Sequence, residues 1–156
     1  MAGPMTAREY FCAARDAAQQ MRDHDQRRER EAAKCGLRAR SWESSSHGSV
    51  LDAMRHVDSV VDMDAERPKV MRECERLLSE AYEVAGGVGA WFGDRYAEVL
   101  TRRFLWLEPW DEVADDMHVT ATHAERMCDM ALDLADSEGV ARLKDWRHCE
   151  RRTGAI

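Results

Sequence analysis

The spacing of apolar residues along the chain predicts helices almost throughout. From about Thr6 to Lys34, small and apolar residues recur three, four or seven positions apart, with strongly polar residues between them. This period indicates one amphipathic helix whose narrow, alanine-rich stripe suits pairing with a second helix. We expect it to end at Cys35-Gly36, because glycine commonly follows a helix C-terminus. The stripe comprises Tyr10, Ala14, Ala17, Met21, Arg28, Ala32 and Cys35.

A serine-rich stretch at about 36–49 predicts a connector, since serine competes for backbone hydrogen bonds and Ser49 can cap a following helix. Helical periodicity returns from Val50 to Ala85 and keeps its face across Pro68, which favours one kinked helix over two. Residues 1–85 are therefore predicted to form an antiparallel, coiled-coil-like helical hairpin through which the protein self-associates. The glycines of 86–89 are predicted to form a hinge to the next part.

Three short amphipathic segments follow, over 94–104, 109–117 and 122–135. The last two are separated by a four-residue break, with Thr120 placed as an N-cap and Pro109 at a helix start. A short helix, a tight turn and a longer helix is the layout of a helix-turn-helix, although the pattern alone also fits a plain helical bundle. We therefore predict an all-α fold with a helix-turn-helix domain over 86–138 and a basic tail over 139–156.

Residues in the C-terminal segment match a known pattern without gaps: Val99-Leu100, Arg103-Phe104, Trp110 to Ala114, Thr120, Arg126 and Ala131-Leu132. With these residues the segment resembles region four of sigma factors, and more closely the sigma-like ArpU-type late-gene regulators of bacteriophages and prophages. The resemblance spans nearly the whole chain, but only the last ~45 residues carry specific signal. It implies an all-helical fold, DNA binding through the second helix of the motif and a role in phage or prophage gene expression.

The first turns of the 122–135 helix are expected to reach DNA. Thr122 and Arg126 suit base or phosphate contacts, and His123 suits either. Glu125 can accept a hydrogen bond from a cytosine amino group, whereas phosphates repel it. The residues predicted to bind DNA are Thr120, Thr122, His123, Arg126, Arg102 and Arg103.

Charge complicates this prediction, because the chain carries a net charge of −7 and residues 91–136 alone carry 11 acidic and 4 basic side chains. Affinity for duplex DNA depends on basic residues that neutralise phosphates. A second subunit, the basic tail or contact with RNA polymerase is therefore part of the hypothesis.

Other chemistry finds little support in the sequence. The five cysteines include no C-x-x-C pair, and His118, His123 and Cys128 lack the spacing of zinc ligands. His118 is better explained as a turn residue, because histidine tolerates positive φ. Neighbouring carboxylates diverge along their helices, and no nucleotide-binding or nucleophile motif is found. We expect no catalytic residues, metal or cofactor, and a cytoplasmic protein without signal peptide or membrane helix.

The leading hypothesis is a phage-type transcriptional regulator that binds double-stranded DNA, with RNA polymerase as a further partner. The alternative is an acidic helical module that binds a polymerase or packaging protein without autonomous DNA binding. A third interpretation is the small DNA-recognition subunit of a phage packaging machine, which shares the layout of hairpin and motif.

Overall fold

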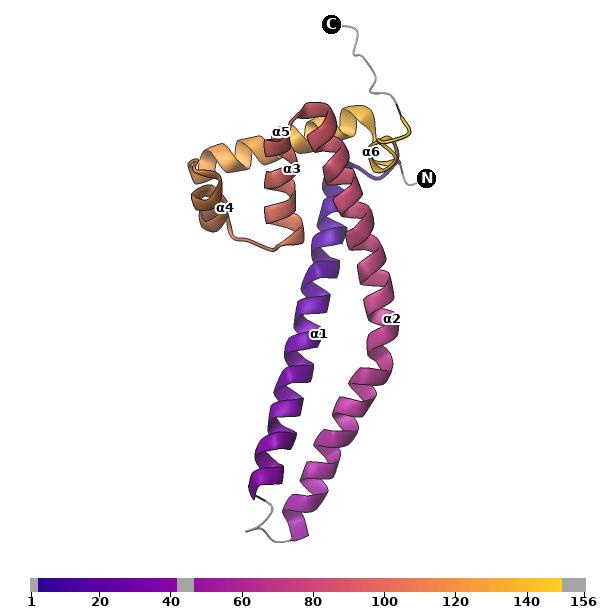
Figure 1. Cartoon of the computed structure of the whole chain (residues 1–156), viewed down its shortest axis with the longest axis vertical. Helices are drawn as coiled ribbons and strands as arrows, with labels where there is room; N and C mark the ends of the chain where they lie inside the picture. Colours follow the sequence, from indigo (N-terminus) through magenta and orange to yellow (C-terminus); the bar gives the residue numbers. More distant parts are fainter. Residues whose placement is uncertain (1–2, 42–46, 150–156) are drawn as a thin grey trace, which may run out of the picture. The chain divides into compact units, whose positions relative to one another are not determined.

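The computed structural model describes residues 3–41 and 47–149, and every regular element in these ranges is helical (Figure 1). Within them, side chains are described for 3–34, 58, 61, 62, 65 and 69–149. The prediction of an all-α protein is confirmed for this part of the chain.

The chain forms two compact units. Unit 1 combines Met1–Gln19 with Glu75–Ile156, and unit 2 is Gln20–Cys74. This division differs from the predicted domains 1–85, 86–138 and 139–156, because the first turns of the first helix and the last helix contribute to the same core. The elements are α1 (Ala7–Ser41), α2 (His47–Phe92), α3 (Asp94–Leu100), the π-helical turn η2 (Thr101–Leu105), α4 (Trp110–Met117), α5 (Ala121–Glu138) and α6 (Val140–Lys144).

Helix α1 begins with a reciprocal cap. The hydroxyl of Thr6 accepts a hydrogen bond from the backbone N–H of Glu9 at 3.2 Å, and the Glu9 carboxylate accepts one from the Thr6 N–H at 2.8 Å. This arrangement satisfies N–H groups that have no partner inside the helix. The next N–H, of Ala7, donates to the carboxylate of Asp136 in α5 at 2.6 Å. The start of α1 is thereby joined to the C-terminal half of α5.

The core of unit 1 is built from both ends of the sequence. The rings of Phe11 in α1 and Phe104 in η2 lie 5.6 Å apart between centroids. Leu143 of α6 is fully buried in the same cluster, so part of the predicted basic tail belongs to the folded unit. The largest fully buried side chains are Phe11, Leu100, Leu132, Leu143, Val84, Val88, Val99 and Val113.

The predicted glycine hinge at 86–89 is wrong, because α2 continues through these residues to Phe92. The glycines permit close helix packing. A Cβ on Gly87 would collide with the backbone of Leu143 in α6, and one on Gly89 would lie 3.0 Å from the Cβ of Ala97 in α3. The break instead falls at Gly93, whose φ of 127° is disfavoured for residues with a side chain.

The connector is also shorter than predicted. Helix α1 passes through Gly36 and ends at Ser41, and α2 begins at His47, so Ser49 lies within α2. One glycine costs a helix only about 1 kcal/mol, and the good helix formers at 37–40 follow it directly. Residues 42–46 of the predicted connector lie outside the described residues. Helix α2 continues through Pro68 as one element, as the periodicity predicted.

Candidate nucleic-acid interface

The turn between α4 and α5 has a defined backbone structure. His118 adopts the left-handed conformation, with φ 55° and ψ 45°. Its N–H donates to the carbonyl of Asp115 at 3.2 Å, and the N–H of Val119 donates to the carbonyl of Ala114 at 2.9 Å. These two bonds form a Schellman motif, in which Val119 also packs against the core. The interpretation of His118 as a turn residue is confirmed.

Helix α5 begins directly after this turn. Thr120 is its N-cap, and the hydroxyl oxygen accepts a hydrogen bond from the backbone N–H of His123 at 3.2 Å. The predicted capping role of Thr120 is therefore confirmed. The cap fixes the first turn of α5, while its inner face is buried against α3 and α4 through Ala124, Cys128, Ala131, Leu132 and Ala135.

The opposite face of α5 is open at its first turns. Thr120, Thr122, His123 and Arg126 are all exposed, as the predicted interface requires. Thr122, His123 and Arg126 all fall within the first six residues of α5. Their side chains offer a hydroxyl, an imidazole and a guanidinium, which are suitable hydrogen-bonding groups for base edges or phosphates.

Arg102 makes contacts inside the protein. Its guanidinium forms ion pairs with Glu98 at 2.9 Å, Glu108 at 3.2 Å and Asp116 at 2.8 Å. The side chain is only 18 % exposed and lies 5.2 Å from the centroid of the Trp106 ring. Arg102 thus connects α3, the segment after η2 and α4. Its charge is already opposed by three carboxylates before any ligand arrives.

Arg103 is held differently. One of its N–H groups donates to the backbone carbonyl of Glu108 at 3.1 Å, and its guanidinium carbon lies 4.6 Å from the centroid of the Trp110 ring. Burial, followed by the positive charge of Arg15, lowers the pKa of the Arg103 guanidinium. Arg103 lines a hollow with Arg15 of α1, and it does not line the separate hollow that His123 and Arg126 border.

A hollow adjoins the exposed face of α5. His123 and Arg126 line a cavity of about 520 Å³ together with the start of α3. Its wall includes Tyr96, whose hydroxyl lies 3.0 Å from the sulfur of Met130, a residue 52 % exposed. The predicted contact residues of α5 thus border apolar as well as polar surface.

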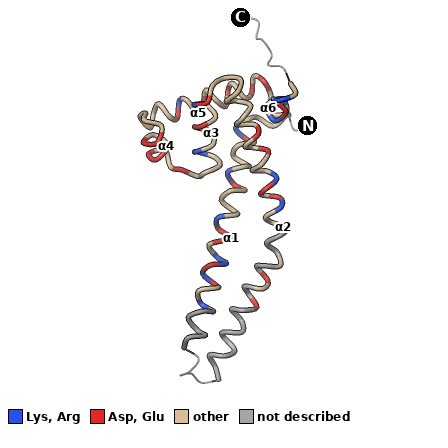
Figure 2. The backbone as a smooth tube through the Cα atoms, viewed as in Figure 1, with Lys and Arg blue, Asp and Glu red and all other residues tan. Residues whose placement is uncertain are grey.

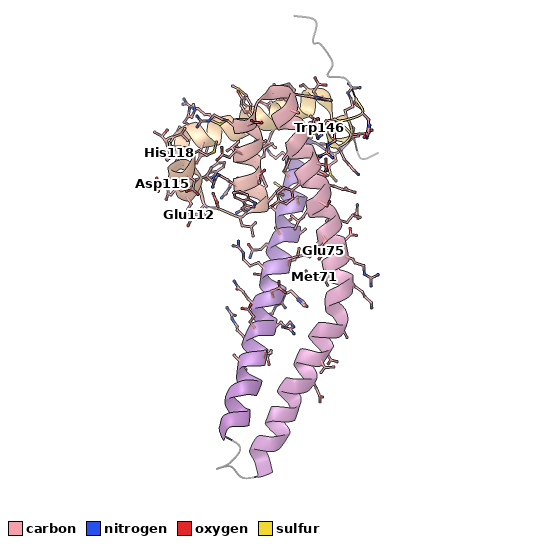
Figure 3. The ribbon with its side chains drawn as sticks, in the orientation of Figure 1. Met71, Glu75, Glu112, Asp115, His118 and Trp146 are labelled. Atoms are coloured by element: carbon pink, nitrogen blue, oxygen red, sulfur yellow. The ribbon has the colours of Figure 1, made fainter. Side chains whose placement is uncertain are left out.

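Acidic residues dominate α4, as Figure 2 shows. The exposed carboxylates are Asp111, Glu112, Asp115 and Asp116, and Figure 3 marks Glu112 and Asp115 on this helix with His118 at its end. Phosphates would be repelled from this surface. The outer face of α4 is therefore unsuited to binding a polyanion.

Sequence reasoning did not anticipate the basic residues that α1 brings to α5. Arg8 forms an ion pair with Asp129 at 2.6 Å, although 121 positions separate them. Arg15 lines a cavity that also contains Arg103 and Glu125 of α5. Neither arginine belongs to a local motif, so only the tertiary packing reveals their position.

The described residues contain no group of three or more His, Cys, Asp or Glu side chains arranged to hold a metal ion. Cys12, Cys74, Cys128 and Cys149 are free thiols, and Cys128 is buried. Among the described helices, none combines the length and apolar character needed to cross a membrane.

Comparisons with protein-family models, curated proteins and solved structures find no match to this chain.

Proposed function

We propose that the protein is a phage-type transcriptional regulator that binds double-stranded DNA in the cytoplasm through a helix-turn-helix formed by α4, the turn at 118–120 and α5. The observation that carries this proposal is the exposure of Thr122, His123 and Arg126 on the first turns of a helix fixed by a Schellman turn and a threonine cap. In DNA-binding helix-turn-helix proteins the second helix enters the major groove with its N-terminal residues against the bases.

The dimensions of α5 fit this role. Its 18 residues correspond to a length of about 27 Å at 1.5 Å per residue. Its buried face is apolar, so it is held against unit 1 while the exposed face remains open. Arg126 offers the bidentate donor geometry that recognises guanine, and Thr122 a hydroxyl for a base or phosphate.

The acidic residues of the helix-turn-helix limit how tightly one copy can bind DNA. With 11 acidic and 4 basic side chains over 91–136, the helix-turn-helix alone neutralises few phosphates. We therefore propose that a second copy, joined through an antiparallel hairpin of α1 and α2, doubles the number of contacts. RNA polymerase is the further proposed partner, because contact with it would add affinity without additional DNA contacts.

Fluorescence anisotropy with labelled duplexes from the protein's own genomic neighbourhood tests the proposal. Binding should weaken steeply between 50 mM and 200 mM salt, the range over which phosphate contacts are lost (roughly 10³-fold for six contacts). Arg126→Ala and Thr122→Ala should reduce affinity, whereas the matched control Ser137→Ala, at the far end of α5, should not. A well-folded protein that retains no DNA at low salt would exclude direct binding.

A second candidate function is a protein-interaction module, favoured by the four exposed carboxylates of α4. Such a surface is complementary to a basic patch on polymerase or a packaging protein. A pull-down with nuclease-treated host lysate separates the two functions. Polymerase subunits retained without DNA, and released when Asp111, Glu112, Asp115 and Asp116 are changed to the corresponding amides, would support the interaction module.

A further inference from the structure

A cavity of about 380 Å³ lies between the first turns of α1 and the exposed side of α5. Its polar lining comes from three elements that are distant in sequence. The charged residues that line it are Arg8, Arg15, Arg103, Glu125 and Asp129. All of them belong to unit 1, so the cavity is formed within one compact part of the protein.

The charges in this cavity are not balanced. Arg8 is paired with Asp129 at 2.6 Å, which leaves Arg15, Arg103 and the single carboxylate of Glu125. Neither Arg15 nor Arg103 forms an ion pair with any carboxylate of the described residues. Two guanidinium groups that share a hollow repel each other, and an anion between them would relieve this repulsion.

Arg103 is also fixed in place. Its guanidinium donates one hydrogen bond to the backbone carbonyl of Glu108 and stacks on the face of the Trp110 ring. The bond to Glu108 uses one of the five N–H donors of Arg103. Arg103 forms no other hydrogen bond with the described residues, and its side chain lines the cavity. A guanidinium held in this way loses little side-chain entropy when it binds an oxyanion, and its planar fork matches phosphate oxygens.

We propose that Arg15 of α1 and Arg103 of η2 form a phosphate-binding site beside α5. If α5 enters the major groove, as the proposed function has it, a phosphate of the neighbouring DNA backbone would occupy this site. This part of the inference therefore rests on the proposed function. Glu125 belongs to the exposed first turns of α5, as do Thr122 and Arg126, so the cavity adjoins the helix that is proposed to meet DNA. The same chemistry also accommodates free phosphate, and Glu125 weakens either form by like-charge repulsion.

Inorganic phosphate is the first probe. In NMR spectra of the Arg side-chain Nε–H groups of the full-length protein, phosphate should shift the signals of Arg15 and Arg103 saturably, whereas chloride at equal ionic strength should not. Arg15→Gln should abolish the shift of Arg103 and Glu125→Gln should enhance binding. The matched control Arg76→Gln removes the same charge outside the cavity and should leave phosphate binding unchanged. If phosphate shifts neither signal, the proposal is overturned, whatever the protein does with DNA.

Duplex DNA is the second probe and identifies the source of the phosphate. Arg15→Gln should weaken DNA binding roughly fivefold at low salt and reduce the slope of log K against log salt by about one, as expected for one lost phosphate contact. Arg15→Lys keeps the positive charge and should therefore restore part of the slope of log K against log salt. A purely structural defect at position 15 would not be corrected by this substitution. If DNA binding is unaffected while inorganic phosphate still binds, the site takes a free phosphate. If the wild-type protein binds no DNA, the proposed regulator function fails while the phosphate titration still decides the site.

Discussion

Gly87 of α2 lies directly against the backbone of Leu143 in α6. A Cβ at position 87 would lie 3.1 Å from both Cα and the carbonyl carbon of Leu143, and closer still to its carbonyl oxygen. Backbone atoms cannot move aside as the end of a flexible side chain can. The contact therefore requires glycine, and it fixes α6 in the core of unit 1.

Gly87→Ala should destabilise the protein by about 2 kcal/mol, because an overpacked contact must be relieved by moving α6. Gly86→Ala is the matched control, since a Cβ there lies no closer than 3.5 Å to the Trp146 indole nitrogen. This second change should stabilise α2 by roughly 0.5–1 kcal/mol, the usual gain of alanine over glycine within a helix. Urea unfolding followed by circular dichroism measures both. Equal effects of the two substitutions would contradict the packing explanation.

His118→Gly should stabilise the protein by about 1 kcal/mol. His118 has φ 55°, and the left-handed conformation costs a residue with a Cβ roughly 1–2 kcal/mol more than glycine. The gain is partly offset by the greater freedom of glycine in the unfolded chain. His123→Gly serves as the opposite control, because His123 lies within α5 and its replacement by a poorer helix former should cost roughly 0.5 kcal/mol. Thermal unfolding of both variants tests the turn assignment, and a loss of stability in His118→Gly would argue against it.

The features that the sequence predicted correctly depend on neighbouring residues. Thr120 as a helix cap and His118 as a turn residue follow from the chemistry of the next three or four positions. The helical periodicity of the last third likewise predicted α4 and α5 close to their observed bounds, and the predicted segment 94–104 corresponds to α3 together with η2. Local interactions decide these features, so a single sequence is enough to identify them.

The features that could not be predicted from the sequence depend on residues far apart in the chain. The glycines at 86–89 look like a hinge because nothing local reveals that Gly87 meets Leu143 and Gly89 meets Ala97. The cavity of Arg15 and Arg103 is hidden for the same reason. The net charge of residues 91–136 leaves out Arg8 and Arg15, which α1 brings to α5. Tertiary packing, rather than local propensity, determines such sites.

Cys128 should resist alkylation in the folded protein. Burial, followed by the negative charge of Asp129, raises the pKa of its thiol from 9.0 to about 12. Because the thiolate is the reactive species, iodoacetamide at pH 8.5 should modify exposed Cys12 and reach Cys128 only after unfolding. Peptide mass spectrometry with and without urea measures this difference. Equal labelling of the two cysteines without urea would contradict the burial of Cys128.

The same thiol makes stability depend on pH. The folded state binds the Cys128 proton more tightly than the unfolded chain, so its contribution to the free energy of unfolding is present below about pH 9. That contribution is lost as pH rises from there towards 12. Tyr10 has a pKa raised to about 12 by burial and acts in the same direction. Comparison of the wild type with Cys128→Ala therefore isolates the thiol, and the variant should show the shallower decline between pH 9 and 10.5.

Arg102→Ala should lower stability by about 2 kcal/mol, whereas Arg126→Ala should change it by less than about 0.5 kcal/mol. Removing Arg102 leaves the carboxylates of Glu98, Glu108 and Asp116 close together without their shared cation. Arg126 is exposed on α5, and surface substitutions of this kind are nearly neutral.

The two variants also separate folding from recognition. If both lose DNA binding, Arg102→Ala should do so with a lower urea midpoint, and Arg126→Ala with an unchanged one. Arg102→Lys is the informative companion, because a single ammonium cannot reproduce a guanidinium that contacts three carboxylates. Full stability in Arg102→Lys would show that charge alone suffices at this position. Unchanged stability in Arg102→Ala, combined with weakened DNA binding, would instead place Arg102 at the DNA interface with Arg126.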